Sequence, residues 1–429
     1  MLNKLFGVDK KKHSIRTEIL AGITTFITMS YILAVNPAMF SNLDMPAGAV
    51  FTATALAAVV GTLAMALLAK LPFGLAPGMG LNAFFVYTVC LSMGYSWQFA
   101  LTAVLLEGIL FIIVTLSNIR EAIVNAIPQS LRHAISAGIG LFIAFIGLQN
   151  AGIIVSDANT IVAMGDITSS GALLAVIGLI ITACLIILRI PGALLWGMLI
   201  TAVIGIPMGL TNLQGVVDMP ESIAPIFCQF EWSNIFTADM VVVVLTMFFI
   251  DMFDTIGSLV GVCTKADMLT PEGKIPNAKQ AFMADAVATT VGACFGTNTT
   301  TTYVESAAGV AQGGKTGLTA FIVAVGFALA LFFSPLFLSI PGVATAPVLI
   351  MVGLFMFESA KNIPMDDYSE SLPAFICIIL MPLAYSISAG ILIGMISYVV
   401  INLMTGKFKK LTVTMYILAI LFILRYIFL

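Results

Sequence analysis

The chain has 429 residues, of which 60% are hydrophobic and 9% are charged. A soluble domain carries charge on about a quarter of its positions, so this composition excludes a water-soluble globular protein. The net charge of −3 gives no reason to expect a nucleic-acid partner. Apolar runs such as 19–40, 50–69 and 172–188 match the roughly 17 to 25 residues of a membrane-crossing helix, so we expect a polytopic protein whose surroundings are lipid bilayer.

Lysine and arginine gather in every second connection between apolar runs, and positive charge favours the cytoplasmic side of short loops. The pattern predicts about fourteen membrane segments in a plasma (inner) membrane, with a cytoplasmic N-terminus and a retained first helix. The last apolar run, 411–429, contains Arg425, and we expect it not to cross the membrane fully. The basic groups lie at Lys4 to Arg16, Lys70, Arg120 with Arg132, Arg189, Lys265 to Lys279, Lys315, Lys361 and Lys407 to Lys410.

Few residues indicate metal, disulfide or cofactor chemistry. The two histidines, His13 and His133, lie at basic loop edges, and no metal site or cofactor is expected. Two acidic residues next to basic ones, Glu18 and Glu358, are interpreted as interfacial. The cysteines show no paired spacing and are interpreted as small core residues; they are Cys90, Cys184, Cys228, Cys263, Cys294 and Cys377.

Two membrane segments are interrupted at corresponding places in the two halves of the chain. Pro77 and nearby glycines break the third segment, and the β-branched run from Thr299 to Thr302 favours extended backbone in the tenth. Seven segments per half, an odd number, would give the halves opposite orientations in the membrane. We therefore predict an all-α polytopic fold of two inverted seven-helix repeats, with short extended stretches in segments three and ten and a binding site between them.

Acidic residues in apolar surroundings are the main candidates for chemistry. Asp251 and Asp254 have the i, i+3 spacing of one helix face, and two such carboxyl groups favour sharing a proton. The alternative is a structural carboxylate that bonds a neighbouring helix, although a charge at mid-membrane is costly. Glu305 opens a predicted half-helix, where it would accept N–H groups from a heterocycle or cap its own helix.

Further polar and aromatic residues lie next to these positions. Asn82 offers a donor and an acceptor to the edge of a base, although asparagine is also common at helix starts. Phe84 and Phe85 would stack on a purine ring or simply pack. Glu107 and Asp285 are predicted to form structural hydrogen bonds, with a supporting role at the site as the alternative.

Four sequence motifs carry a family resemblance. Residues 78–83 read GMGLNA, residues 251–257 read DMFDTIG, and residues 301–306 read TTYVES, while the opening 17–26 reads TEILAGITTF. In these motifs the chain resembles the guanine/hypoxanthine and adenine permease branch of the nucleobase-cation symporter-2 superfamily. The likeness runs from about Lys4 to the end.

The resemblance implies a two-domain architecture with elevator-like movement of one domain against the other. A core domain would comprise 1–117 and 237–340, and a gate domain 118–236 and 341–410, with 411–429 as a separate apolar segment. It also implies a homodimer through the gate domain as one possible assembly.

The family's substrate-contacting groups fall on Asn82, Asp251 and Glu305, with Asp254 as a supporting carboxylate. Phe84, which directly follows the motif at 78–83, and Tyr303, within the motif at 301–306, are added as substrate contacts, and proton coupling is placed on the three acidic residues. Which aspartate touches the base stays open, because related branches carry a histidine where this chain has Ser258.

The resulting hypothesis is a secondary transporter, not an enzyme, that imports a purine nucleobase together with H⁺ or Na⁺. An anion transporter of the same fold, for sulfate or a dicarboxylate, is the alternative; carboxylates at the predicted site argue against it. An intramembrane aspartyl hydrolase is a third, weaker hypothesis, because Asp251 and Asp254 share one helix.

Overall fold

The protein is described from a computed structural model that covers residues 2–9, 13–117, 128–158, 160–265, 268–269, 275–412, 415–416 and 419. The basic group around Arg120 and most of 411–429 lie outside these residues. Within them, nine helices are long and apolar enough to cross a membrane. Three shorter apolar helices, the helix Ala278–Phe295 and the interrupted segment around 300–311 complete the fourteen segments that the sequence predicts.

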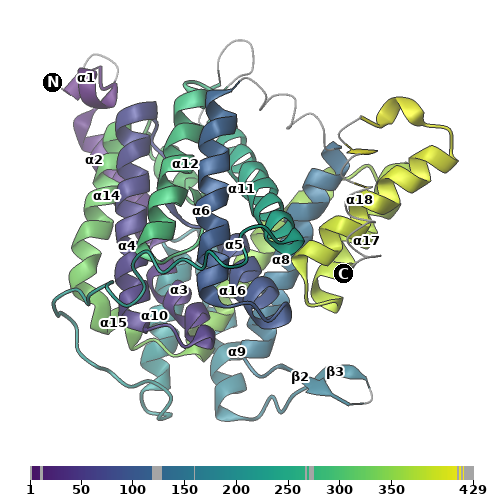
Figure 1. The fold of residues 1–429 in the computed structure, drawn as a ribbon. Coiled ribbons are helices and arrows are strands. Elements are labelled where there is room, and N and C mark those ends of the chain that lie inside the picture. Colours follow the sequence, from purple (N-terminus) through teal and green to yellow (C-terminus); the bar gives the residue numbers. More distant parts are fainter. Residues whose placement is uncertain are drawn as a thin grey trace.

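One set of elements, here called the core bundle, packs around the two interrupted segments (Figure 1). Helices α2, α4, α12 and α14 contact one another in pairs, and α6 packs against both α11 and α12. Phe51 and Phe337 are among the side chains that fill the apolar interior between them. The members are α2 (Ile15–Met29), α3 (Ile32–Phe40), α4 (Ala47–Ala64), β1 (Leu75–Pro77), α5 (Met79–Ala83), α6 (Trp97–Leu116), α11 (Ala238–Lys265), α12 (Ala278–Phe295), β4 (Thr300–Thr302), α13 (Ser306–Ala311) and α14 (Gly317–Ala330).

The second set, the gate bundle, packs mainly within itself and lies to one side of and below the core bundle in Figure 1. Helix α8 lies against both α16 and α17, and α9 lies against α10 and α16. Its members are α8 (Gln129–Asn150), α9 (Ser170–Ile187), α10 (Ala193–Gly205), α16 (Gly342–Phe357), α17 (Tyr368–Leu383) and α18 (Ile387–Met404). The smaller elements are α1 (Leu2–Phe6), the hairpin β2 (Ile154–Asp157) with β3 (Ile161–Met164), and α15 (Ser334–Leu338).

The extended stretches predicted in the two interrupted segments are present and pair with each other. Strands β1 and β4 are antiparallel, with Leu75 opposite Thr302 and Pro77 opposite Thr300. The pairing satisfies backbone groups that would otherwise be stranded away from water, where each costs several kcal/mol. The antiparallel direction agrees with halves of opposite orientation.

Small residues allow the two helices that precede these breaks to approach closely. A Cβ atom added at Gly61 of α4 would lie 2.7 Å from the Cβ of Ala288 on α12, closer than real Cβ atoms come. Side-chain hydroxyls then hold the strands in place: Thr62 bonds both backbone groups of Leu75, and Thr289 bonds both backbone groups of Thr300. The two halves therefore build the strand pair in matching ways.

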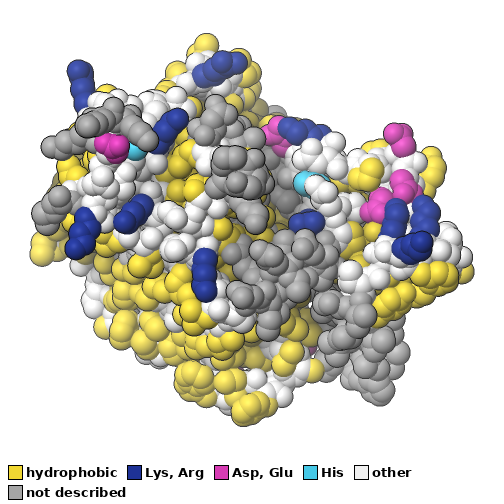
Figure 2. All heavy atoms as spheres, turned by 90° about the horizontal axis from the view of Figure 1, so that it is seen from above, with side chains coloured by type: hydrophobic (Ala, Val, Ile, Leu, Met, Phe, Trp, Pro, Cys, Tyr) yellow, Lys and Arg dark blue, Asp and Glu magenta, His cyan; other side chains and the backbone are white. Residues whose placement is uncertain are grey.

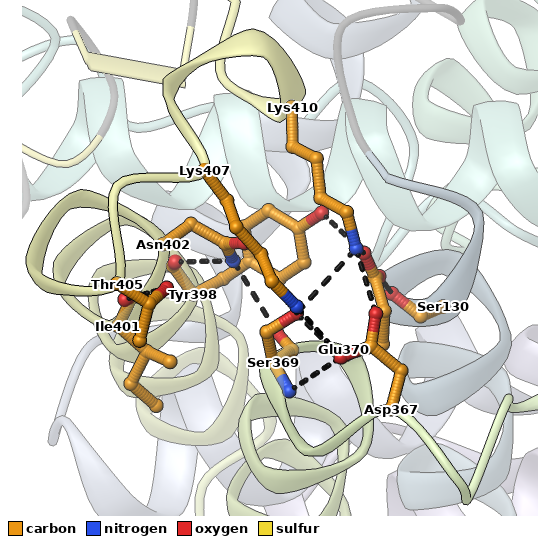
Figure 3. Close-up of polar contacts among 10 residues, drawn as sticks. All are labelled: Ser130, Asp367, Ser369, Glu370, Tyr398, Ile401, Asn402, Thr405, Lys407 and Lys410. Carbon is orange, nitrogen blue, oxygen red and sulfur yellow. Dashed lines mark hydrogen bonds and ion pairs between the residues drawn. The ribbon is translucent and has the colours of Figure 1, made fainter.

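Basic side chains are visible across one face of the molecule (Figure 2). The face that includes α1 carries lysine and arginine side chains around its surface (Figure 2). At the gate bundle, Lys407 and Lys410 pair with Asp367 at 3.0 and 2.9 Å, and Lys410 also pairs with Glu370 at 2.7 Å (Figure 3). Lys410, with Ser369 and Lys407, holds the pKa of Asp367 well below its usual range. This cluster ties the end of α18 to the start of α17.

The interfacial interpretation of Glu18 is wrong. Its side chain is buried, and it accepts hydrogen bonds from the backbone N–H groups of Lys315 and Thr316 and from the Thr319 hydroxyl at 2.5 Å. A carboxylate at the N-terminus of α14 satisfies amides that have no partner within the helix. Glu358, in contrast, is exposed and forms the expected ion pair with Lys361.

The interpretation of the cysteines as core residues is right for Cys90, Cys263 and Cys377 but wrong for two others. Cys184 and Cys228 are exposed. The Cys228 N–H donates to the Cys294 carbonyl at 2.8 Å, and the two side chains interact. The connection between the two halves is thereby fastened to the end of α12.

Candidate functional site

The strand pair β1–β4 is the structural centre of the site. Two further backbone bonds extend it: Gly78 N–H donates to the Thr299 carbonyl, and Tyr303 N–H donates to the Gly74 carbonyl, each at 3.0 Å. Glycine is required at 78 because an added Cβ would lie 2.6 Å from the Thr301 side chain. Asn82 lies on the short helix α5, just after β1, and Glu305 lies just before α13.

A cavity of about 390 Å³ opens between the two bundles and reaches Glu305. Core residues from α2 and α13 form one wall, and the α9–α10 connection with Arg189 forms the other. Glu305 is half-buried and makes no side-chain cap bond to α13. The Tyr31 hydroxyl donates to its Oε1 atom at 2.7 Å, so the carboxylate is held from across the core bundle.

The aromatic residues around Glu305 are Tyr31 and Tyr303. Their ring centroids lie 6.4 Å apart with the planes tilted by 41°. The Tyr303 hydroxyl donates to the carbonyl of Pro77 at 2.6 Å, which fixes the ring against β1. Both rings are almost fully buried, so they support the carboxylate rather than presenting an open face.

The two aspartates of α11 face different neighbours, although they share a helix. Asp254 is half-buried and lies within electrostatic reach of Glu305 and Tyr31. Asp251 is fully buried and faces the Glu107 carboxyl of α6. The expected closeness in space is present, but Asp254 interacts with Glu305, which lines the cavity, whereas Asp251 faces Glu107.

Within the core bundle lies a second group of buried polar side chains, here called the inner carboxyl group: Glu107, Asp251 and Asp285 with Thr255, Thr299 and Thr301. The Thr299 hydroxyl donates to Glu107 Oε2 at 2.9 Å. The Thr255 hydroxyl donates to Asp285 Oδ2 at 2.8 Å and lies 2.7 Å from the Thr301 hydroxyl. Three helices and one strand therefore converge on these carboxyl groups.

Asn82 and Phe84 are both completely buried. The Asn82 amide oxygen has no donor among the described residues, and its NH₂ group has only a long contact of 3.9 Å to the Met79 sulfur. A buried amide without partners is costly, which is consistent with a ligand contact. Phe84 belongs to the apolar core, and Phe85 stacks on Phe40 with centroids 5.0 Å apart, so both rings serve packing in this structure.

Tyr31 is the residue that sequence reasoning missed. It lies between α2 and α3, in an apolar run that the sequence analysis treats as one continuous helix. It follows the motif TEILAGITTF at 17–26, which carries the family resemblance but indicates no role for Tyr31. Its partner Glu305 is 274 positions away, so no local pattern could connect them.

Fourteen membrane segments, two bundles and a site built from two interrupted segments define a multi-pass membrane carrier. The solved transmembrane domain of a cyanobacterial bicarbonate transporter, BicA, has the same fold: the TM-score is 0.66 at 15% identity, with 87% of this chain and 97% of that chain covered. At that identity the likeness establishes the fold and not the passenger.

Sequence comparison gives the family. Residues 16–393 match the profile of the permease family that covers xanthine and uracil permeases. A guanine/hypoxanthine permease of Bacillus subtilis, PbuG, is 44% identical over 100% of both chains. An adenine permease of Escherichia coli, AdeQ, is 40% identical over 99% of this chain and 96% of that one. The chain belongs to this family, the nucleobase-cation symporter-2 family, as the motifs predict.

Proposed function

We propose that this protein imports purine nucleobases across the plasma membrane by proton symport. The passenger would lie at the cavity between the two bundles, where Glu305 and Asp254 accept its N–H groups and the Asn82 amide reads a further edge. The observation that carries the proposal is a half-buried carboxyl group at the cavity, Glu305, which interacts with a second half-buried carboxyl group, Asp254. The buried Asn82 amide oxygen, which has no donor among the described residues, adds a further candidate contact. Such groups suit a neutral heterocycle that carries several N–H donors.

The relatives support a purine passenger. Two proteins that match this chain at 44% and 40% identity over nearly their whole length are a guanine/hypoxanthine permease and an adenine permease.

An anion passenger is the second candidate, and one feature favours it. Arg189 lies on the gate side of the cavity and is the positive charge among the described residues that line it. The fold neighbour BicA is a bicarbonate transporter. Against an anion, Glu305 and Asp254 would repel it at the point where the interrupted helices meet, and the repulsion is strong in a low-dielectric setting.

The movement that we propose is a displacement of the core bundle against the gate bundle. The cavity lies at their junction, so sliding one past the other would expose Glu305 alternately to the two sides. The face with abundant lysine and arginine in Figure 2 would be cytoplasmic, which puts the N-terminus inside.

An uptake panel tests the proposal. Radiolabelled adenine, guanine, hypoxanthine, xanthine and uracil would be presented to cells that lack their own purine permeases and express this chain, with and without a protonophore. We expect purine uptake that the protonophore abolishes and that sulfate or a dicarboxylate does not compete. Glu305→Gln should lose uptake, whereas Glu358→Gln, the same change at an exposed ion pair, should keep it. Retained uptake in Glu305→Gln, or competition by the anions, would refute the proposal.

A further inference from the structure

Asp251 and Glu107 are buried carboxyl groups that face each other without a donor between them. Among the described residues, no hydrogen-bond donor reaches either carboxyl oxygen of Asp251 or the Oε1 atom of Glu107. Both side chains are completely buried, and they face each other where α6 packs against α11. Two buried carboxylates cannot both stay ionised at such close range, whereas one shared proton would satisfy both.

The neighbouring hydroxyl groups explain why no other donor is supplied. Thr255 has one proton, and it goes to Asp285 Oδ2. The 2.7 Å contact between Thr255 and Thr301 must therefore use the proton of Thr301. Thr301 also faces Asp251 but has no second proton to give. The other titratable groups that act on this pair, Asp254 and Asp285, are also acidic, so neither offsets the negative charge of the pair.

The same chain of hydroxyls can run in the opposite direction. If Asp285 holds a proton, it donates to Thr255, Thr255 donates to Thr301, and Thr301 donates to Asp251. Each hydroxyl then receives one proton and gives one, so the net change is the transfer of one H⁺ from Asp285 to Asp251. The reversal moves no heavy atom and needs no water inside the core bundle.

From this geometry we infer that the coupling proton of the carrier binds between Glu107 and Asp251 and reaches them through Thr301, Thr255 and Asp285. The inference rests on the proposed function and deepens it. It separates two tasks: Glu305 and Asp254 hold the passenger, and Glu107 with Asp251 holds the ion. Thr299 keeps Glu107 in place through its bond to Oε2.

The test uses the purified full-length protein in liposomes and four variants. Glu107→Gln keeps the size of the side chain but cannot share a proton, and Glu358→Gln is its matched control. Thr255→Val breaks the hydroxyl chain, and Thr182→Val is the control because that buried hydroxyl donates to Gly178 of its own helix. Purine binding, exchange of labelled purine at equal concentrations, and accumulation under a pH gradient are measured for each.

A carrier that moves one proton per purine concentrates its passenger about tenfold per unit of pH gradient. We expect this accumulation from wild type and both controls. Glu107→Gln should bind and exchange purine but give no accumulation, and Thr255→Val should exchange normally but accumulate slowly. Accumulation by Glu107→Gln equal to that of wild type would overturn the inference, as would accumulation by wild type that follows Na⁺ instead of the pH gradient.

Infrared spectroscopy of the wild-type protein gives a readout that does not depend on a variant folding. A shared buried proton predicts a protonated-carboxyl band that shifts in D₂O and persists at neutral pH without purine. Absence of that band overturns the inference. Failure of the wild type to bind purine would instead refute the proposed function, because the band is read without any passenger.

Discussion

Removal of a single hydroxyl, by Tyr31→Phe, tests the arrangement of the passenger site most directly. The Tyr31 hydroxyl is the side-chain donor that reaches Glu305, at 2.7 Å, and the ring of the variant would keep its contact with Tyr303. A hydrogen bond to a charged group contributes about 1.5–3 kcal/mol. That range equals about 10- to 150-fold in an equilibrium constant.

We expect the dissociation constant for the purine to rise by that factor, because Glu305 must hold one orientation to accept a purine edge. Binding to purified protein is measured by calorimetry, and the Michaelis constant for uptake is measured in cells. Tyr398→Phe is the matched control, since Tyr398 donates to Glu370 at 2.9 Å within the gate bundle, away from the cavity. Equal affinities for wild type, Tyr31→Phe and Tyr398→Phe would refute the reasoning.

Three further predictions concern the framework of the protein. Glu18→Ala should lower the thermal melting temperature in detergent, because each buried amide left without an acceptor costs about 1–3 kcal/mol; Glu358→Ala should leave it unchanged, and equal melting of the two variants would contradict this. A mild oxidant should join Cys228 to Cys294, seen as a mass loss of two hydrogens in the linked peptides, and unlinked thiols would show that the contact is wrong. Asp367→Asn should lower the melting temperature at neutral pH by a margin that is constant down to about pH 5. The folded-state pKa of Asp367 lies below the unfolded value of about 4, so its stabilisation is complete above that value. The stabilisation disappears as the pH falls through the folded pKa. A margin that grows on acidification would contradict that sign.

Backbone chemistry made the two interruptions predictable from the sequence. Pro77 cannot donate a helical hydrogen bond, and the threonine run favours extended backbone, so both breaks and the half-helix after Thr302 could be placed in advance. The carboxyl groups could also be chosen, because an acidic residue in an apolar run is costly wherever it lies. These signals are local or compositional, and they survive without knowledge of the tertiary contacts.

Partners could not be predicted, because they lie far apart in the chain. Glu18 was assigned to the interface from its neighbour Arg16, whereas its partners Thr316 and Thr319 lie about 300 positions away. Glu107 likewise meets Thr299, and the separation of the two α11 aspartates into different environments depends on which helices pack against each side. Periodicity places Asp251 and Asp254 on one face but does not say what that face meets.

The pairing of β1 with β4 also has a consequence for how the protein is made. Each strand comes from a different half, and the register joins Leu75 to Thr302, so neither half can complete the ladder alone. During synthesis the first strand must wait in the bilayer without its ladder partner until the ribosome has released more than two hundred additional residues. Halves expressed as separate polypeptides should therefore regain transport only when both are produced in the same cell.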